Sequence, residues 1–562
     1  MKLYRMRTLV AVLGAATVMG ADAAPAVISA WQVVVNNGDF MPTDTCDLAY
    51  TPTPSCRMFN SYNQPSVNAD QLVVIRARSR GGQGGQNVHG IYARDMAAGT
   101  PVVKILDRDT QVPPPNNLDT TFIEPPSFPR IDIGSDTIAT RGNHQPVWEY
   151  FLYDGTETRA GTSGIYTTPF GALITGASKL GVVPDFSFFE VPEAPGIPFD
   201  VFPGAPAITD GATVAFKGNY TVNAVGKTGV YYRDLVNAPI PMTPAGGTNP
   251  VVLIANNSDT VIPGTDPPVI FGSTAPPSAA IREAVFAGFD NEDSPTLGGI
   301  YLAPLDGTTK PPLTTLVRIG EQVPGEPSQN TFNRLGEGVS FDSRFVAFWG
   351  AWGTEMKTLI LECPMDGNRD RTAFCNEQYP DGFEVKVSVH QGIFVHDLKN
   401  GTTHAVAKSP SDFDDFVYWN FSGRVPGTGE GDDEDGEPAR WRSANFVAVS
   451  GLADGNLEDA TFHAAFKARS SEVVDGASVN PVDGIYLRQG PGMSRIVTVV
   501  EKGMDGTILD SEAIVAETGA VLPVTEMGIE RDGFRGNSLV INASMGTEEA
   551  GWAGIYLTEV PK

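Results

Sequence analysis

Basic residues, cysteine and long apolar runs are all scarce in this chain of 562 residues. Lys and Arg number 39 against 66 Asp and Glu, and a formal charge of −27 argues against nucleic acid and anionic membranes as partners. The motifs Gly-x-Ser-x-Gly, His-Glu-x-x-His and Gly-x-x-x-x-Gly-Lys are absent, so the common serine-hydrolase, zinc-protease and phosphate-loop sites are not indicated. After the first segment no stretch is apolar enough for a membrane helix, and we expect no membrane anchor.

The first 23 residues have the pattern of an export signal. Lys2, Arg5 and Arg7 precede an apolar run over residues 8–20, which is too short to span a bilayer. Ala21-Asp22-Ala23 fits a small-x-small cleavage site. We therefore predict a signal peptide at 1–23, a mature chain at 24–562, and a secreted or periplasmic location.

Four cysteines form two pairs that are close in sequence, Cys46 with Cys56 and Cys363 with Cys375. An oxidising compartment would favour two local disulfides. A metal site is the alternative, but neither pair has Cys-x-x-Cys spacing or a neighbouring histidine.

A short motif, Gly-Ile-Tyr or a close variant, occurs seven times. Before each copy lies an apolar strand with the pattern Val-Ala-Phe-x-Gly or a variant of it. The copies of the first motif begin at Gly90, Gly164, Gly229, Gly299, Gly392, Gly484 and Gly554. Each unit of roughly four short strands is bounded by Gly, Pro and Asp turns, with no apolar period of 3.6 residues, so we expect little helix.

Seven four-stranded units predict an all-β protein, a single seven-bladed β-propeller. A solenoid is the alternative, although solenoid repeats are shorter and more regular. The opening segment, from Trp31 to Phe59, reads as the first half of a unit and residues 539–557 as the last half. We expect the two to share one blade and close the ring of a monomer. Two long intervals predict insertions at about 353–390, with one cysteine pair, and at about 427–440, an acidic Gly-rich loop.

Position x of the Val-Ala-Phe-x-Gly strand carries the strongest functional signal. Together with the residue two further on, it gives fourteen positions, six of which are Arg or Lys in a chain poor in both. In a propeller these positions form a ring, and we predict a basic and aromatic ligand-binding ring at the mouth or channel. The alternative is that these side chains lie on outer edges and only face water. The predicted ligand-binding residues are Arg76, Arg78, Arg141, Asn143, Lys217, Trp349, Lys467 and Arg469.

Three weaker hypotheses remain open. His144 and Glu149 lie in a polar, aromatic segment and could form an acid–base pair, although such a segment is more often a connecting loop. Asp366, Asn368 and Asp370 resemble a calcium loop only faintly, because Gly367 and Arg371 do not fit its spacing. We expect no cofactor, with calcium as the alternative, and the acidic loop is a further place where calcium could bind.

The repeat pattern resembles the tandem propeller-type repeats of secreted bacterial proteins whose function is unassigned. The resemblance implies an architecture and carries over no catalytic residue, because propellers host lyases, hydrolases and binding modules alike. Two functions therefore stay open. One is binding of an anionic polysaccharide or another extracellular protein. The other is a polysaccharide lyase or hydrolase with its site at the propeller mouth.

Overall fold

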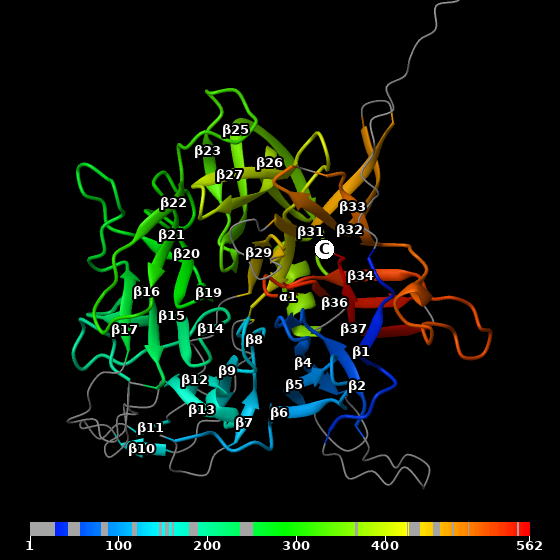
Figure 1. Ribbon diagram of the computed structural model, residues 1–562, viewed down its shortest axis with the longest axis horizontal. Helices are drawn as coiled ribbons and strands as arrows, with labels where there is room; N and C mark the ends of the chain where they lie inside the picture. Colours follow the sequence, from blue (N-terminus) through cyan, green and yellow to red (C-terminus); the bar gives the residue numbers. More distant parts are fainter. Residues whose placement is uncertain are drawn as a thin grey trace, which may run out of the picture.

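The chain forms a ring of seven β-sheets in a computed structural model, so the predicted seven-bladed propeller is confirmed (Figure 1). Each sheet is an antiparallel blade of four strands, and the innermost strand is divided into two pieces in several blades. The described residues are 28–42, 57–79, 88–114, 121–144, 149–151, 157–159, 162–178, 189–236, 251–365, 369–423, 425, 439–452, 461–474, 477–492, 494–547 and 550–561.

The blades follow one another along the chain, from the innermost strand outward. Blade 1 comprises β2 (Phe59–Tyr62), β3 (Ser66–Val67), β4 (Leu72–Ser79), β5 (His89–Asp95) and β6 (Val103–Asp107). Blade 2 comprises β7 (Phe122–Glu124), β8 (Arg130–Ile131), β9 (Ile138–His144), β12 (Thr162–Thr167) and β13 (Ile174–Ser178). Blade 3 comprises β14 (Ala207–Thr209), β15 (Thr213–Val222), β16 (Val225–Asp234) and β17 (Val252–Asn256).

The remaining blades repeat this order. Blade 4 comprises β18 (Ser273–Thr274), β19 (Ser278–Ala280), β20 (Glu283–Phe289), β21 (Gly298–Pro304) and β22 (Thr314–Arg318). Blade 5 comprises β23 (Phe332–Leu335), β24 (Ser340–Asp342), β25 (Phe345–Leu361), β26 (Phe383–Asp397) and β27 (Thr402–Lys408). Blade 6 comprises β30 (Val447–Leu452), β31 (Thr461–Val474), β32 (Ala477–Gly490) and β33 (Val497–Glu501). Blade 7 comprises β34 (Val524–Gly528), β35 (Phe534–Arg535), β36 (Ser538–Gly546), β37 (Gly551–Glu559) and β1 (Gln32–Asn36).

The innermost strands close the ring around its axis. Contacts run from β3 to β8, β14, β19, β24, β30 and β35, and β35 returns to β3. Serine hydroxyls link neighbours in this circle: Ser66 donates to the carbonyl of Pro129 at 2.8 Å, and Ser278 donates to that of Val339 at 2.6 Å. These short strands therefore form the wall nearest the axis.

The two ends of the chain meet in blade 7. The outermost strand β1 pairs antiparallel with β37, which confirms that N- and C-terminal strands close the ring. Asp510, which precedes β34, strengthens the junction by accepting hydrogen bonds from Asn36 at 2.8 Å and Trp552 at 2.9 Å. The expectation that the whole opening segment shares this blade is wrong for Phe59, because Phe59 begins β2 and pairs with β4 in blade 1.

The repeated motifs are packing signals inside each blade. The tyrosine of Gly-Ile-Tyr lies over the glycine two residues earlier: a Cβ at Gly90 would sit 2.6 Å from the hydroxyl oxygen of Tyr92. A phenylalanine of the first strand meets that aromatic ring edge-on, as Phe59 does Tyr92 at 5.0 Å between ring centroids. Comparable pairs recur in blades 2 to 5 at 4.8–5.3 Å, and each adds roughly 0.5–1.5 kcal/mol beyond its buried area.

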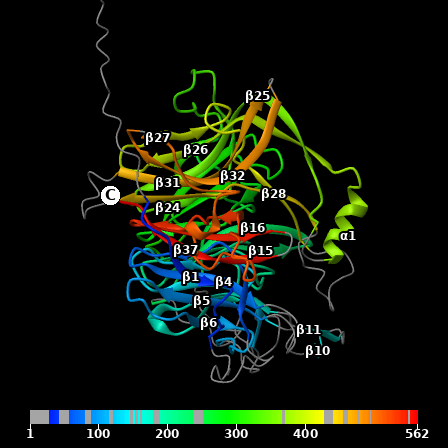
Figure 2. The same ribbon diagram turned by 90° about the vertical axis from the view of Figure 1, so that its right-hand side faces the viewer.

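Additional elements project from one face of the ring (Figure 2). The ends of β25 and β26 extend beyond the blade and carry the helix α1 (Arg369–Gln378), which the sequence did not indicate because Cys375 is its only buried residue. The hairpin of β28 (Tyr418–Ser422) and β29 (Arg440–Ala444) lies on the same side, near the middle of the ring in Figure 1. Blade 2 carries a smaller hairpin, β10 (Glu149–Phe151) with β11 (Glu157–Arg159). Among the described residues, no helix is long and apolar enough to cross a membrane.

Candidate functional site

The innermost strand is interrupted where it passes position x of the second strand. In blade 1 the interruption is residues 63–65, between β2 and β3, and Asn63 donates its backbone N–H to the carbonyl of Arg76 at 3.0 Å. In blade 5 it is residues 336–339, and Gly336 donates to Trp349 at 2.8 Å. Each position x also pairs with the isoleucine or valine of the following Gly-Ile-Tyr motif, as Arg76 does with Ile91 and Lys467 with Ile485. The seven positions therefore lie at one level, beside the wall of the channel.

The interruption of blade 6 is much longer than the others, and that of blade 7 carries a run of charges. In blade 6 the first strand begins with Asp415, which bridges to Arg469, and resumes only at β30. The intervening residues 416–446 include the β28–β29 hairpin. In blade 7 residues 529–533 separate β34 from β35 and carry three charged side chains in succession, Glu530, Arg531 and Asp532.

Two arginines of the predicted ring form hydrogen bonds with the backbone of the next blade. The Arg76 guanidinium donates to the carbonyl of Pro125 and the side-chain oxygen of Asn63. Arg141 donates to the carbonyl of Phe202 at 3.0 Å. Pro125 and Phe202 each belong to the interruption of the next blade. These two arginines therefore have a structural use, whatever else they bind.

Other members of the predicted ring are more accessible. Arg78 is exposed and donates to the hydroxyl of Ser61 at 3.0 Å. Lys217 and Asn143 are half-buried, and Trp349 donates its indole N–H to Gln391 at 2.9 Å. The ring is thus polar on most blades, but its side chains serve different contacts.

Lys217 faces a charged group from blade 5. Glu337 lies in the interruption of that blade, and its side chain is solvent accessible although the surrounding blades crowd it. Desolvation by these neighbours raises the pKa of Glu337, while Lys217 and Arg440 act against this and Glu292 adds to it. The hairpin residue Arg440 and the ring residue Lys217 therefore share one neighbourhood.

Lys467 and Arg469 lie beneath the hairpin. The Lys467 ammonium is 4.2 Å from the ring centroid of Tyr418 and 5.8 Å from that of Phe446. Arg469 lies 5.3 Å from the Tyr418 ring and forms two hydrogen bonds with Asp483, at 2.7 and 3.4 Å. Burial lowers the pKa of Lys467, whereas the bonds to Asp483 outweigh burial and raise that of Arg469. Contacts of a cation with an aromatic face are worth about 0.5–2 kcal/mol.

The hairpin is held above the ring by a small aromatic cluster. Phe421 lies 5.5 Å from Trp441 within the hairpin and 6.4 Å from Phe374 of α1. Trp441 stacks on Phe383 at the start of β26, with centroids 6.4 Å apart. The predicted disulfide between Cys363 and Cys375 is confirmed, with an S–S distance of 2.00 Å, and it ties α1 to the end of β25.

A histidine joins the basic residues of blade 1. The Nδ1 atom of His89 is 4.0 Å from a carboxylate oxygen of Glu124, which is also 3.9 Å from the Arg76 guanidinium. Burial lowers the pKa of His89, and Arg76 lowers it further against the opposing effect of Glu124. The lowered pKa favours the neutral imidazole, which is the form that a general base needs.

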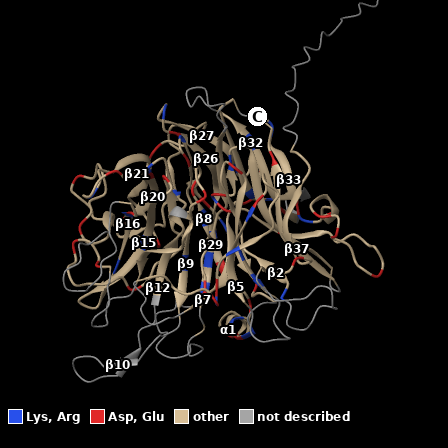
Figure 3. Cartoon of the chain, turned by 60° about the horizontal axis from the view of Figure 1, so that its bottom comes forward, with Lys and Arg blue, Asp and Glu red and all other residues tan. Residues whose placement is uncertain are grey.

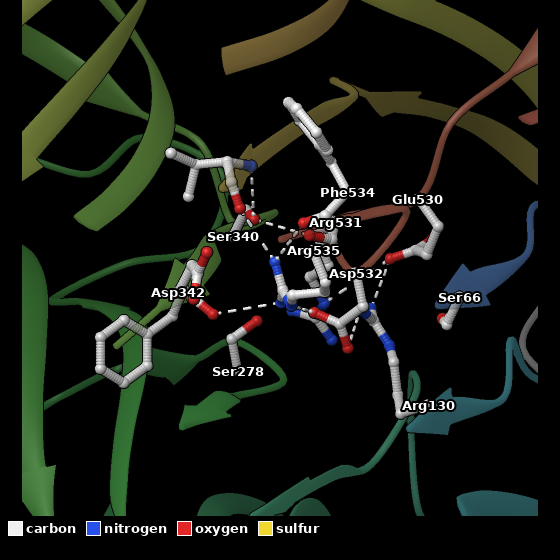
Figure 4. A network of polar contacts seen from close by, with 12 residues as sticks. Ser66, Arg130, Ser278, Ser340, Asp342, Glu530, Arg531, Asp532, Phe534 and Arg535 are labelled. Carbon is white, nitrogen blue, oxygen red and sulfur yellow. Dashed lines mark hydrogen bonds and ion pairs between the residues drawn. The ribbon is translucent and has the colours of Figure 1, made fainter. Parts of the chain in front are cut away.

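A second charged group occupies the centre of the ring (Figure 4). We define the central cluster as Arg130, Asp342, Glu530, Arg531, Asp532 and Arg535. Arg130 is 2% exposed, forms an ion pair with Glu530 and lies 2.9 Å from Asp532, which also pairs with Arg535. Burial opposes ionisation of Asp532, but Arg130 and Arg535 outweigh it and lower its pKa. Burial raises the pKa of Asp342.

The cluster connects most of the blades. Arg531 donates to the carbonyl of Pro276 in blade 4 at 3.1 Å, and its own carbonyl accepts from Ser340 of blade 5 at 2.6 Å. The Arg535 guanidinium donates to the backbone carbonyl of Val449 in blade 6 at 3.0 Å. The backbone N–H of Val67 in blade 1 donates to the backbone carbonyl of Asp532 at 3.0 Å. The loop of blade 7 that carries Arg531 and Asp532 thus lies at the centre of the ring and is hydrogen-bonded to several other blades.

The weaker predictions have mixed outcomes. His144 is 4% exposed and hydrogen-bonded to the Tyr166 hydroxyl, and burial lowers its pKa to about 3, so it belongs to the blade interior. The side chain of Glu149 lies outside the described part, and the acid–base pair stays a prediction. The described residues hold no group of three His, Cys, Asp or Glu fit for a metal ion.

Several predicted segments fall outside the described residues. These are 1–23, Cys46, Cys56, Asp366, Asn368 and most of the acidic loop, whereas Asp370 lies in the first turn of α1 and Arg440 begins β29. The signal peptide, the first disulfide and calcium binding therefore stay predictions.

Comparison with known proteins gives similarity of fold alone. No family model matches the chain, and no curated protein matches it. Similar solved structures include the β-propeller domain of the Trilobed protease from Pyrococcus furiosus, with 9% identity, a TM-score of 0.38, and coverage of 90% of this chain and 96% of that one. An oligogalacturonate lyase in complex with manganese has 8% identity, a TM-score of 0.33, and coverage of 90% and 97%. An α-L-arabinanase from Penicillium chrysogenum complexed with arabinobiose has 7% identity, a TM-score of 0.26, and coverage of 95% and 99%.

Three features escaped the sequence reasoning. The interruptions of the innermost strand, the hairpin above Lys467 and the central cluster all depend on pairings between distant segments. One signal was available for the cluster: the run Glu530-Arg531-Asp532 stands between apolar residues that read as strand. A charged run flanked by apolar residues indicates buried, paired charges as readily as a surface loop.

Proposed function

We propose that this propeller binds an anionic polysaccharide outside the cytoplasm, on the face that carries the hairpin. The supporting observation is a set of four cations at the mouth, Arg78, Lys217, Arg440 and Lys467, that form no ion pair with any described residue. Figure 3 shows basic segments of β29 and its neighbours near the middle of the ring, whereas many acidic segments lie in outer loops. Unpaired cations in a chain of charge −27 attract an anion locally against the overall field.

The proposed location has separate support. The first 23 residues have the pattern of an export signal, and Cys363 and Cys375 form a disulfide. Disulfides persist mainly in oxidising compartments. A secreted or periplasmic protein would meet acidic polysaccharides there.

The test is a triple variant, Arg78→Gln, Lys217→Gln and Arg440→Gln, titrated with polygalacturonate by calorimetry. We expect affinity to fall at least about tenfold, since each unpaired cation contributes Coulomb attraction to the bound anion. Arg76 and Arg141 are left intact because they bind the backbone of adjacent blades.

The matched control removes charge elsewhere, with Arg318→Gln on the outermost strand of blade 4 and Lys386→Gln on the extended part of β26, both exposed. The control should bind like the wild type. A wild-type protein that binds none of polygalacturonate, alginate and heparin would contradict the proposal.

One observation favours a second candidate, a polysaccharide-active enzyme with its site at the same mouth. One carboxylate oxygen of Glu124 lies 4.0 Å from Nδ1 of His89 and 3.9 Å from the Arg76 guanidinium. Such a group can orient an imidazole base beside an anionic substrate. Incubation with polyuronates should then release shorter oligosaccharides, and His89→Ala should abolish this release while retaining binding. Intact polymer after prolonged incubation with the wild type would rule this candidate out.

A further inference from the structure

The β28–β29 hairpin has two chemically different faces. Side chains alternate along a strand, and residues directly paired across an antiparallel ladder share a face. Phe421 pairs with Trp441, and Trp419 pairs with Ser443, so these lie on one face. The opposite face carries Tyr418, Asn420, Arg440 and Arg442. The hairpin is therefore aromatic on one side and basic on the other.

The aromatic face is already covered by the protein. Phe421 contacts Phe374 and Tyr379 of the α1 region at 6.4 and 6.1 Å, and Trp441 stacks on Phe383. The basic face must therefore turn toward the ring. Two observations agree with this orientation: the ring of Tyr418 lies over the Lys467 ammonium, and the charges of Arg440 and Lys217 both act to lower the pKa of Glu337.

Lys467 lies under this face. It is half-buried between Tyr418 and Phe446, and the nearest acidic influence, Asp483, is engaged by Arg469. The hydroxyl of Tyr418 is also buried and has no hydrogen-bond partner among the described residues. The ammonium thus lies over the ring of a tyrosine whose buried hydroxyl has no partner among the described residues, and a hydrogen-bond acceptor would relieve the cost of burying these two polar groups.

We propose that Lys467, with Tyr418 and the basic face of the hairpin, forms a carboxylate subsite that holds one uronate residue of the bound polysaccharide. This inference rests on the proposed function and adds its ligand class. A single compact ammonium plus a neutral hydroxyl suits a carboxylate, which carries one charge on two oxygens. The exposed amide of Asn420 and the half-buried ring of Phe446 offer a hydrogen bond and an apolar surface to the sugar.

The hairpin thereby becomes the element that selects the ligand. It occurs within the interruption of blade 6, and the equivalent interruption of blade 1 has only residues 63–65. In the part of the chain that the structure describes, no other blade has a hairpin within this interruption, so the subsite belongs to blade 6 although the repeat has seven copies.

The experiment compares Lys467→Met and Lys467→Arg with the wild type, using polygalacturonate, fully methyl-esterified polygalacturonate, dextran sulfate and poly-glutamate. The wild type should bind polygalacturonate at least about tenfold more tightly than its methyl ester. Lys467→Met should lose about tenfold in affinity for polygalacturonate and little for dextran sulfate, because the lost group is specific for a carboxylate and dextran sulfate carries only sulfates. Lys467→Arg should recover part of the loss, since it restores charge without the compact shape.

The matched control is Lys386→Met, an exposed lysine on the extended part of β26, which should bind like the wild type. Thermal unfolding checks that each variant is folded. If Lys467→Met does not fold, Arg440→Gln, at an exposed position, gives the same comparison.

Each outcome decides the proposal. Equal affinity of wild type and Lys467→Met for polygalacturonate would overturn the subsite and leave the proposed function standing. Equal losses for dextran sulfate or for poly-glutamate would overturn the assignment to a uronate. If the wild type binds none of these polymers, the subsite and the proposed function are both wrong.

Discussion

The central cluster and the mouth are both rich in cations, but they use them in opposite ways. At the centre, Arg130 and Arg535 are buried and each pairs with a carboxylate. At the mouth, Arg78 is exposed and Lys467 lies against aromatic rings, and neither forms an ion pair with a described residue. A buried charge must be paired within the protein, whereas a cation at the mouth can take its partner from solution.

This difference separates stability from function. Loss of a partner at the centre leaves an uncompensated charge in a water-poor environment. Loss of a cation at the mouth removes one attraction for an anion and leaves the fold intact. Three changes test whether the separation holds.

The largest expected effect is at the centre. Arg130→Met removes the cation that pairs with Glu530 and lies 2.9 Å from Asp532, and Arg531 and Arg535 are then the only cations of the central cluster near these buried carboxylates. We expect the free energy of unfolding to fall by about 3–5 kcal/mol. Urea unfolding followed by tryptophan fluorescence measures it. Arg78→Met, the same change at the mouth, should alter stability by less than about 0.5 kcal/mol. Similar losses for both variants would erase the distinction between the two regions.

Lowering the pH should destabilise the fold through a buried histidine in the interior. His463 is 1% exposed beside Phe534 of blade 7, with ring centroids 6.3 Å apart, and burial lowers its pKa to about 4. An unfolded chain has a histidine pKa of about 6.5, so between these values the unfolded state binds more protons and stability falls as pH falls. The contribution approaches about 1.4 kcal/mol per pH unit.

The measurement is the unfolding free energy of wild type and His463→Gln at several pH values from about 7 down to about 4. The variant should show a shallower decline in this window. Parallel curves for the two proteins would mean that His463 does not couple protonation to folding.

Salt should weaken ligand binding at the mouth and should hardly change the stability that the central cluster provides. Raising the ionic strength from about 0.05 to about 0.5 M shortens the screening length severalfold, so affinity for polygalacturonate should fall about tenfold or more. The buried ion pairs of the central cluster are screened much less, and the unfolding midpoint should shift little. Affinity that is independent of salt would show that the unpaired cations do not bind the polymer.

The repeat made the blade predictable, and it made the ring positions predictable as well. The tyrosine over Gly90 and its equivalents impose one packing solution on every unit, so a local pattern was enough. The same pattern identified Lys217 and Lys467 as equivalent positions. It could not reveal that Arg76 and Arg141 bind the next blade, because those carbonyls are 49 and 61 residues away in sequence.

The irregular segments were the unpredictable part. The helix α1 has no apolar stripe, and its attachment through Cys375 depends on a disulfide and on aromatic contacts with the hairpin. His144 stood in a polar segment that suggested chemistry, yet its neighbours Phe122 and Tyr166 place it in an aromatic core. A polar stretch of sequence does not show whether its side chains are buried, because burial depends on which residues of neighbouring strands pack against them.

The sequence by itself determined the number of blades, their four strands and the closure by the two ends, because glycine, tyrosine and phenylalanine at fixed spacings allow few alternatives to this sheet. Only the tertiary structure decided which cations are paired. Arg130 and Glu530 are 400 residues apart, and Lys467 meets Tyr418 across an insertion. Ring closure brings such residues together, and the energy of a charge depends on its neighbours in space and on its exposure to water.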